Sequence, residues 1–171
     1  MTAIATHRTA LKWATELLEM TMADVTPEQA HWQPAGAANP VGATYAHAIC
    51  GLDGVVNGLL RGAAPLFAGS WAGKTGVSDP QMISTPEWAR SVRLDMTAAR
   101  TYAQAAYVDA DTYVAGLSEA DLARELDLSA VGFDTRTLDW CLSALVTGHL
   151  NNMAGEISCL KGIQGAKGYP F

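Results

Sequence analysis

The sequence predicts an all-α protein: an up-and-down four-helix bundle with long crossover loops. Two observations lead to this prediction. Four amphipathic stretches of roughly 20 residues each carry apolar residues at helical spacing, and no series of alternating strands lies between them. The chain has 171 residues, 49% of them hydrophobic and 16% charged, so it is long enough to bury its own core. We therefore expect a single domain over residues 1–171.

The first half of the chain is expected to contain two long helices and one short turn. Apolar residues recur at spacings of three and four over residues 5–24, which predicts the first helix: Leu11, Ala14, Leu18 and Met22. Thr26 and Pro27 follow as an N-cap and a first helical residue, which is typical of a short helical start. The second helix is expected to run from about residue 40 to about residue 60.

A long excursion is predicted over residues 61–84, which hold four glycines and two prolines. Phe67 and Trp71 within it suggest that it folds back over one end of the bundle. Thr85 and the proline after it are again typical of a helix start, and the third helix is expected to end near residue 108.

Residues 109–136 are predicted to be irregular. A short helical turn is expected after Ser118, and an extended stretch is expected through the alternating apolar residues Leu126, Leu128 and Val131. The fourth helix is predicted over residues 137–162, and a glycine-rich tail follows it.

Charge and cysteine content exclude several classes of protein. The formal net charge is -6 and the eleven basic residues are scattered, which argues against binding to nucleic acid. Charged residues interrupt the first apolar stretch, and no run reaches the ~18 apolar residues of a membrane span, so neither a signal peptide nor a membrane helix is expected. Three cysteines without a CxxC spacing are typical of free thiols in a reducing compartment. We expect a cytoplasmic protein.

The second predicted helix carries a histidine followed by a stripe of glycines. Gly51, Gly54 and Gly58 follow His47 at offsets of four, seven and eleven residues, so all four fall on one side of the helix. Each glycine inside a helix costs up to about 1 kcal/mol relative to alanine, so something must compensate for the stripe. Either a second helix packs closely there, or the stripe leaves space for a ligand beside the imidazole.

The fourth predicted helix carries a second histidine with polar neighbours. Met153 and Glu156 follow His149 at offsets of four and seven, and Asn152 lies slightly to one side. Buried polar groups need partners. Either His149 pairs with Glu156 as a structural contact, or these residues line a pocket, which is the interpretation we prefer.

Cys50 lies three residues after His47, within reach of the imidazole along a helix. A thiol there could act as a nucleophile, but a small buried apolar side chain is the more common role of such a cysteine.

Four segments of the sequence resemble the DinB/YfiT-like superfamily: residues 39–47 (NPVGATYAH), Asp53, residues 148–157 (GHLNNMAGEI) and the tail 161–171. The resemblance extends over nearly the whole chain and implies a four-helix bundle with a pocket inside it. The family pattern is a histidine on the second helix and a His-x-x-x-His pair on the fourth, which together hold a divalent metal such as zinc or nickel. Bundles of this family often form homodimers.

The resemblance matches this metal pattern only in part. His47 matches the ligand of the second helix and His149 the first ligand of the fourth, but Met153 stands where the family has its third histidine. A thioether is a poor ligand for zinc or nickel among imidazoles. Asp53 lies about 120° around the helix from His47, so it is not expected to replace the missing ligand. The resemblance therefore implies at most a weakly bound metal at the two histidines.

Three functions remain open. The first is an enzyme of the isomerase or cyclase type that acts on a small molecule without a tightly bound metal. Here His47 or His149 is the general acid or base, poised by Glu156, and the pocket is shaped by a set of neighbours: Gly51, Gly54, Trp140, Asn152 and Met153. The second is the metal-dependent thiol S-transferase or hydrolase chemistry that the resemblance implies, since family members include bacillithiol- and mycothiol-dependent transferases. The third is a bundle that binds a ligand, or serves a structural role, without catalysis.

Overall fold

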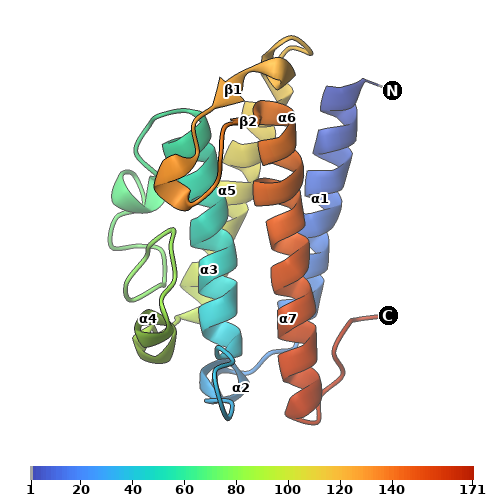
Figure 1. The fold of residues 1–171 in the computed structure, drawn as a ribbon. Coiled ribbons are helices and arrows are strands. Elements are labelled where there is room, and N and C mark those ends of the chain that lie inside the picture. Colours follow the sequence, from blue (N-terminus) through green and yellow to red (C-terminus); the bar gives the residue numbers. More distant parts are fainter. Residues whose placement is uncertain (1) are drawn as a thin grey trace.

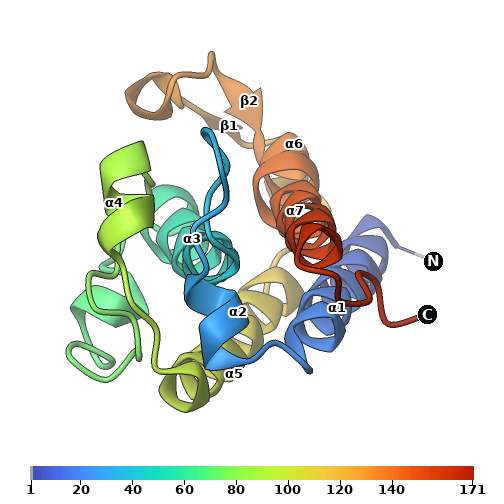
Figure 2. The same ribbon diagram turned by 90° about the horizontal axis from the view of Figure 1, so that it is seen from below.

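The computed structural model describes residues 2–171 and shows a bundle of four long helical rods (Figure 1). Seen along its axis, the bundle has one rod at each corner: α1 (Ala3–Met22), α3 (Val41–Asp53), α5 (Met96–Ala115) and α7 (His149–Ile163) (Figure 2). The predicted all-α bundle is confirmed, with one very small sheet added to it. Within the part of the chain that is described, no helix combines the length and the apolar character that a bilayer crossing requires.

The first helix and the short turn form close to their predicted positions. Thr2 caps α1 by accepting a hydrogen bond from the Ala5 backbone amide, and the apolar stripe points into the core, with Leu18 completely buried. Thr26 and Gln29 form a reciprocal capping box at the start of α2 (Pro27–His31), which lies across one end of the bundle (Figure 2).

The predicted helices over residues 40–60 and 137–162 form as continuous rods, but each contains a π-helical segment. The first rod continues from α3 into the π-helical residues Gly54–Leu60. The second begins as α6 (Leu138–Cys141), passes through the π-helical residues Leu142–Gly148 and continues as α7. A π-helix shifts the helical face by its wider turn and often occurs near functional sites.

The prediction of one helix over residues 85–108 is wrong, because a non-helical segment over residues 92–95 divides it into two helices. The short helix α4 (Pro86–Ser91) ends at Val92, and Leu94 forms an isolated antiparallel bridge with Val77. The side chain of Asp95 then accepts hydrogen bonds from two backbone amides of the next helix, which makes it the N-cap of α5. Helix α5 continues to Ala115, well beyond the predicted end.

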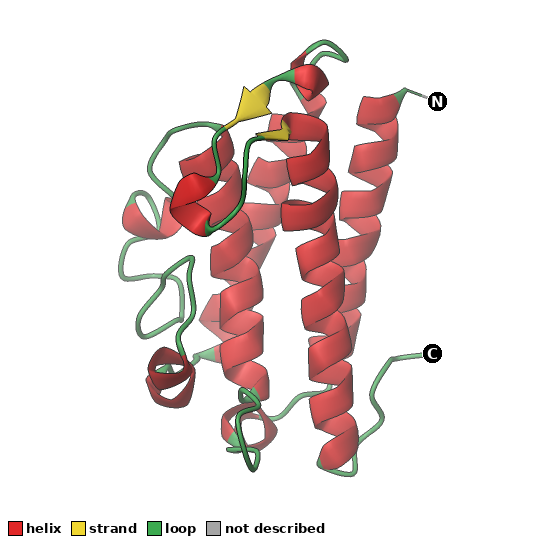
Figure 3. Cartoon of the chain, viewed as in Figure 1, coloured by secondary structure: helices red, strands yellow, loops and turns green. Residues whose placement is uncertain are grey.

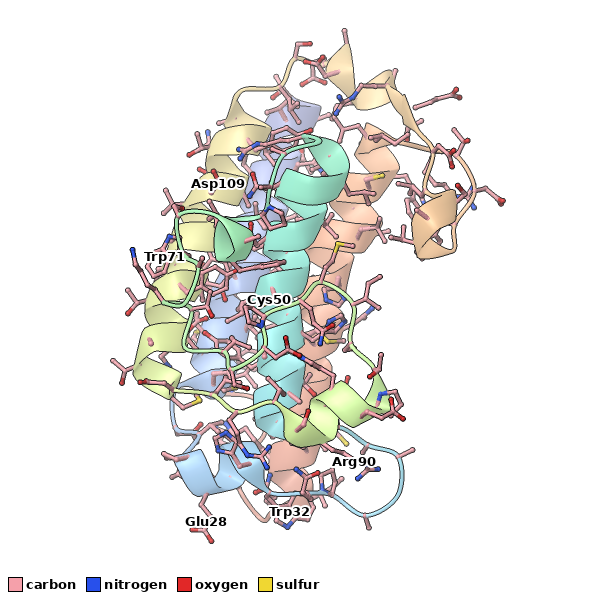
Figure 4. The ribbon with its side chains drawn as sticks, turned by 90° about the vertical axis from the view of Figure 1, so that its left-hand side faces the viewer. Glu28, Trp32, Cys50, Trp71, Arg90 and Asp109 are labelled. Atoms are coloured by element: carbon pink, nitrogen blue, oxygen red, sulfur yellow. The ribbon has the colours of Figure 1, made fainter. Side chains whose placement is uncertain are left out.

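The excursion over residues 61–84 lies along the side of α3, next to α5, and not over an end of the bundle as expected (Figures 1 and 4). The buried carboxylate of Asp53 holds it there. Its oxygens accept hydrogen bonds from the backbone amides of Leu66 (2.9 Å) and Phe67 (3.0 Å) and from the hydroxyl of Tyr102 (2.6 Å). Trp71 packs against Tyr102, with 5.8 Å between ring centroids. A buried carboxylate requires several hydrogen-bond donors, and the excursion supplies two of them, so Asp53 serves as its anchor.

The segment between α5 and α6 contains a hairpin that the sequence did not predict in full (Figure 3). Strand β1 (Glu125–Leu126) pairs antiparallel with β2 (Arg136–Thr137). The expected extended stretch is therefore correct only at Leu126. Leu128 is buried in the loop of the hairpin, and Val131 ends a 3-10 turn. The expected helical turn after Ser118 forms at Asp121–Ala123.

Candidate functional site

The structure brings His47 and His149 together between α3 and α7, which lie side by side (Figure 1). Their ring centroids are 4.8 Å apart and the rings are nearly perpendicular, at 84°. His47 lies in the middle of α3, whereas His149 begins α7 directly after the π-helical segment. The helical face of each rod therefore presents one imidazole to the other.

Both imidazoles have a buried nitrogen that lacks a hydrogen-bond partner within the described residues: His47 Nδ1 and His149 Nε2. Buried polar atoms in folded proteins are nearly always satisfied, so unpaired ones indicate an absent partner such as a ligand, an ion or a water. Gly51 lies beside both rings and makes room for that of His149. A Cβ at this position would lie 3.2 Å from His149 Nε2 and 3.9 Å from His47 Cε1.

The surroundings favour the neutral form of both histidines. Burial lowers the pKa of His47. Burial, together with the neighbouring His47, lowers the pKa of His149 to about 4. At neutral pH each ring therefore has one nitrogen that donates a hydrogen bond and one that accepts.

The two rings border a cavity of about 520 Å³ that opens to solvent. Rods α3 and α6–α7 supply two of its walls, and most of these residues are small or apolar: Gly51, Val55, Trp140, Ala144, Leu145 and Asn152. The crossover segments supply the rest of the wall, from the end of the excursion and from the hairpin loop: Met82, Ile83, Ser84, Val131 and Phe133. A cavity of this size is typical of a small-molecule site.

Of the predicted pocket residues, Gly51, Trp140 and Asn152 line the cavity together with the two histidines. Gly54 does not, because the side chain of Met82 covers it. A Cβ on Gly54 would lie 2.6 Å from Met82 Cβ. The glycine stripe thus accommodates an imidazole at one position and the excursion at the next.

Met153 and Glu156 lie outside the cavity lining. Met153 is half-buried and packs against the hydrophobic core. The carboxylate of Glu156 accepts a hydrogen bond from the hydroxyl of Thr44 at 3.2 Å, and the described residues show no hydrogen bond between Glu156 and His149. The alternative in which His149 pairs with Glu156 is therefore not formed, and the preferred interpretation, a pocket lined by these residues, holds for His149 and Asn152 but not for Met153 or Glu156.

Cys50 is completely buried, and burial raises the pKa of its thiol to about 12. A thiol in this state stays protonated at neutral pH and is a weak nucleophile. This environment agrees with the small apolar role.

The donor set does not fit a metal centre with three protein ligands. Among residues 2–171, no group of three or more histidine, cysteine, aspartate or glutamate side chains is placed to share one ion. His47 and His149 offer two nitrogens, and Met153 adds a neutral, soft sulfur at most. Within the described residues, no third histidine, cysteine, aspartate or glutamate joins the two histidines.

The sequence profile of the DinB superfamily matches residues 10–155. The chain belongs to the DinB superfamily. Among solved structures, this DinB protein is similar to a conserved protein from Enterococcus faecalis, with a TM-score of 0.80 and 21% sequence identity over 96% of this chain and 99% of the other. That likeness supports the DinB fold alone. No functionally curated protein matches the sequence.

Sequence reasoning missed the residues of the DinB pocket that come from its crossovers, chiefly Met82, Ile83 and Phe133. The hint in the sequence was that the glycine-rich excursion over residues 61–84 also holds large apolar side chains, which favour packing against the bundle. It also missed the role of Asp53, although a carboxylate on an otherwise buried helix indicates a demand for several donors.

Proposed function

We propose that this DinB protein is an enzyme that transfers a proton within a small molecule, in a reaction of the isomerase or cyclase type. The observation that carries the proposal is that His47 and His149, each with one buried and unpaired ring nitrogen, line a mostly apolar cavity side by side. A neutral imidazole has a lone pair that accepts a proton, and the resulting imidazolium is an acid that gives it back.

The steps require only the residues of the pocket. A substrate in the cavity places an acidic C–H or O–H near one imidazole, which removes the proton. The second imidazole donates its N–H to the oxygen on which charge develops. Return of the proton to a different atom of the substrate gives an isomer of the same composition. The apolar walls exclude water and hold the reacting atoms in place.

Glu156 is not needed as the partner of His149 in this scheme, because it lies outside the cavity lining and bonds to Thr44. The roles predicted for Gly51, Trp140 and Asn152 remain those of pocket walls. The role of Met153 is to pack against the core beside the pocket.

The test is hydrogen exchange on a substrate carbon. We would incubate the protein in D2O with a panel of small carbonyl compounds and follow deuterium incorporation by mass spectrometry. Wild-type protein is expected to speed exchange for at least one compound, and His47→Gln and His149→Gln are expected to remove the effect. His7→Gln is the matched control, since His7 pairs with Asp139 away from the cavity. Equal exchange in all four proteins, or no acceleration by any of them, would sink the proposal.

A second candidate is a metal-dependent reaction of the kind implied by the resemblance, because the same two unpaired nitrogens suit a weakly held zinc or nickel ion. Calorimetric titration with each metal tests it. Micromolar binding that disappears in His47→Gln would support a metal, whereas no measurable heat up to millimolar metal would exclude this candidate.

A further inference from the structure

The walls of the cavity carry no ionised side chain. The chain has 11 basic and 17 acidic residues, yet none of the thirteen residues that line the cavity in the described structure is Asp, Glu, Lys or Arg. The two histidines beside it are held in the neutral form by burial. A charged ligand that entered would lose its hydration without gaining a counter-charge, and this costs several kcal/mol even in a partly open site.

Three of the four polar residues that line the cavity come from neighbouring positions of α3 and α7, and the fourth, Ser84, comes from the end of the excursion. His47 and His149 face each other, and Asn152 follows His149 by three residues, which is nearly one turn of α7. Earlier on the same rod, Trp140 lies nine residues before His149, no more than about 13 Å away at 1.5 Å per residue. Phe133 from the hairpin loop packs against Trp140, with 5.5 Å between ring centroids. The cavity is thus aromatic at one end and hydrogen-bonding at the other.

We propose that the pocket takes an uncharged molecule with a flat apolar ring body, which lies against Phe133 and Trp140, and a single hydrogen-bonding group, which meets the histidines. This inference rests on the proposed function, because it concerns the same pocket, and it names the class of substrate. Aromatic walls favour flat rings through offset or edge contacts. The two imidazoles supply both a donor and an acceptor to a neutral hydroxyl or carbonyl.

A cation that stacks on the aromatic end also has a carboxylate neighbour. The guanidinium of Arg136 lies 5.3 Å from the ring centroid of Trp140 and 3.7 Å from the carboxylate of Asp134. Neither residue lines the cavity. Arg136 therefore stacks on Trp140 without contributing a charge to the lining of the cavity.

Two fluorescent probes with the same rings test the inference. N-Phenylnaphthylamine is uncharged, and anilinonaphthalene sulfonate carries one negative charge. Both gain emission in an apolar site, so each dissociation constant can be obtained by titration. The uncharged probe is expected to bind at least roughly tenfold more tightly than the sulfonate. Equal or tighter binding of the sulfonate in the pocket would overturn the inference.

Two variants locate the binding and test the role of charge. Ala144→Leu should fill the cavity and weaken the uncharged probe at least roughly tenfold, whereas Ala115→Leu, at an exposed position of α5, should not. Ile83→Arg places a cation at the exposed mouth and is expected to tighten the sulfonate selectively, whereas Ile163→Arg, exposed at the end of α7, should leave it unchanged. If Ala144→Leu does not fold, the Ile83→Arg comparison alone decides. An unchanged affinity of the sulfonate there would refute the argument from charge.

The outcomes separate this inference from the proposed function. Tight binding of the uncharged probe with no loss of deuterium exchange in the histidine variants would remove the proton chemistry and leave the ligand class intact. Preference for the sulfonate, together with deuterium exchange that depends on both histidines, would remove the ligand class and leave the proton chemistry intact.

Discussion

Alanine at Gly54 is expected to destabilise the protein, whereas alanine at Gly58, on the same helical stripe, is expected to stabilise it. Both glycines lie in the π-helical segment that continues α3, and neither has a positive φ. They differ in what a Cβ would meet. At Gly54 it would lie 2.6 Å from both Cβ and Cγ of Met82, and at Gly58 only Pro65 Cγ comes near, at 3.8 Å.

The magnitudes follow from two opposing effects. Replacement of glycine by alanine in a helix gains about 1 kcal/mol, and Gly58→Ala should keep nearly all of it because 3.8 Å is an ordinary contact. Gly54→Ala must push the excursion away, and such overpacking costs about 1 to 3 kcal/mol. The net loss at Gly54 is then up to about 2 kcal/mol.

Urea unfolding monitored by circular dichroism measures both variants, and a Met82→Gly background provides the check. Without the Met82 side chain, Gly54→Ala should become neutral or stabilising, so the double-mutant cycle should show a coupling above about 1 kcal/mol. Additive effects in this cycle, or equal effects of alanine at Gly54 and Gly58, would show that the excursion does not pack on the glycine stripe.

Two further predictions concern buried ionisable groups. The folded pKa of His149, about 4, lies below its unfolded value of about 6.5. The unfolded chain therefore binds the proton more readily, and stability should be full above pH 6.5 and fall by up to roughly 3 kcal/mol as the pH approaches 4. His149→Gln should flatten that pH profile of urea midpoints, and a profile unchanged by the substitution would contradict it. Asp53→Asn should weaken the anchor, cost about 2 to 4 kcal/mol and speed amide exchange at Leu66 and Phe67. The exposed Asp111→Asn should cost less than about 1 kcal/mol, and protection at Leu66 that survives Asp53→Asn would refute the anchoring role.

The candidate site was predictable in part. Helical periodicity showed which residues share a side with His47 and with His149, and the family resemblance implied that these two sides border one pocket. Periodicity gave the correct spacing of Glu156 from His149 along the helix. It did not predict the partner of Glu156, because that partner, Thr44, lies on a different helix. A pairing between helices depends on their rotation and relative height, and the pattern of one helix contains neither.

The sequence by itself determined the all-α bundle, the approximate ends of three of its four rods and the helical faces that carry the two histidines. These features follow from local spacing, caps and apolar periodicity. Only the tertiary structure decided the path of the excursion, the break between α4 and α5, and the cavity walls supplied by Met82 and Phe133. The physical reason is that each depends on contacts between residues distant in sequence: Asp53 with Leu66 and Phe67, Val77 with Leu94, and Gly54 with Met82. Local propensities leave such contacts undetermined, and the packing of the whole chain selects them.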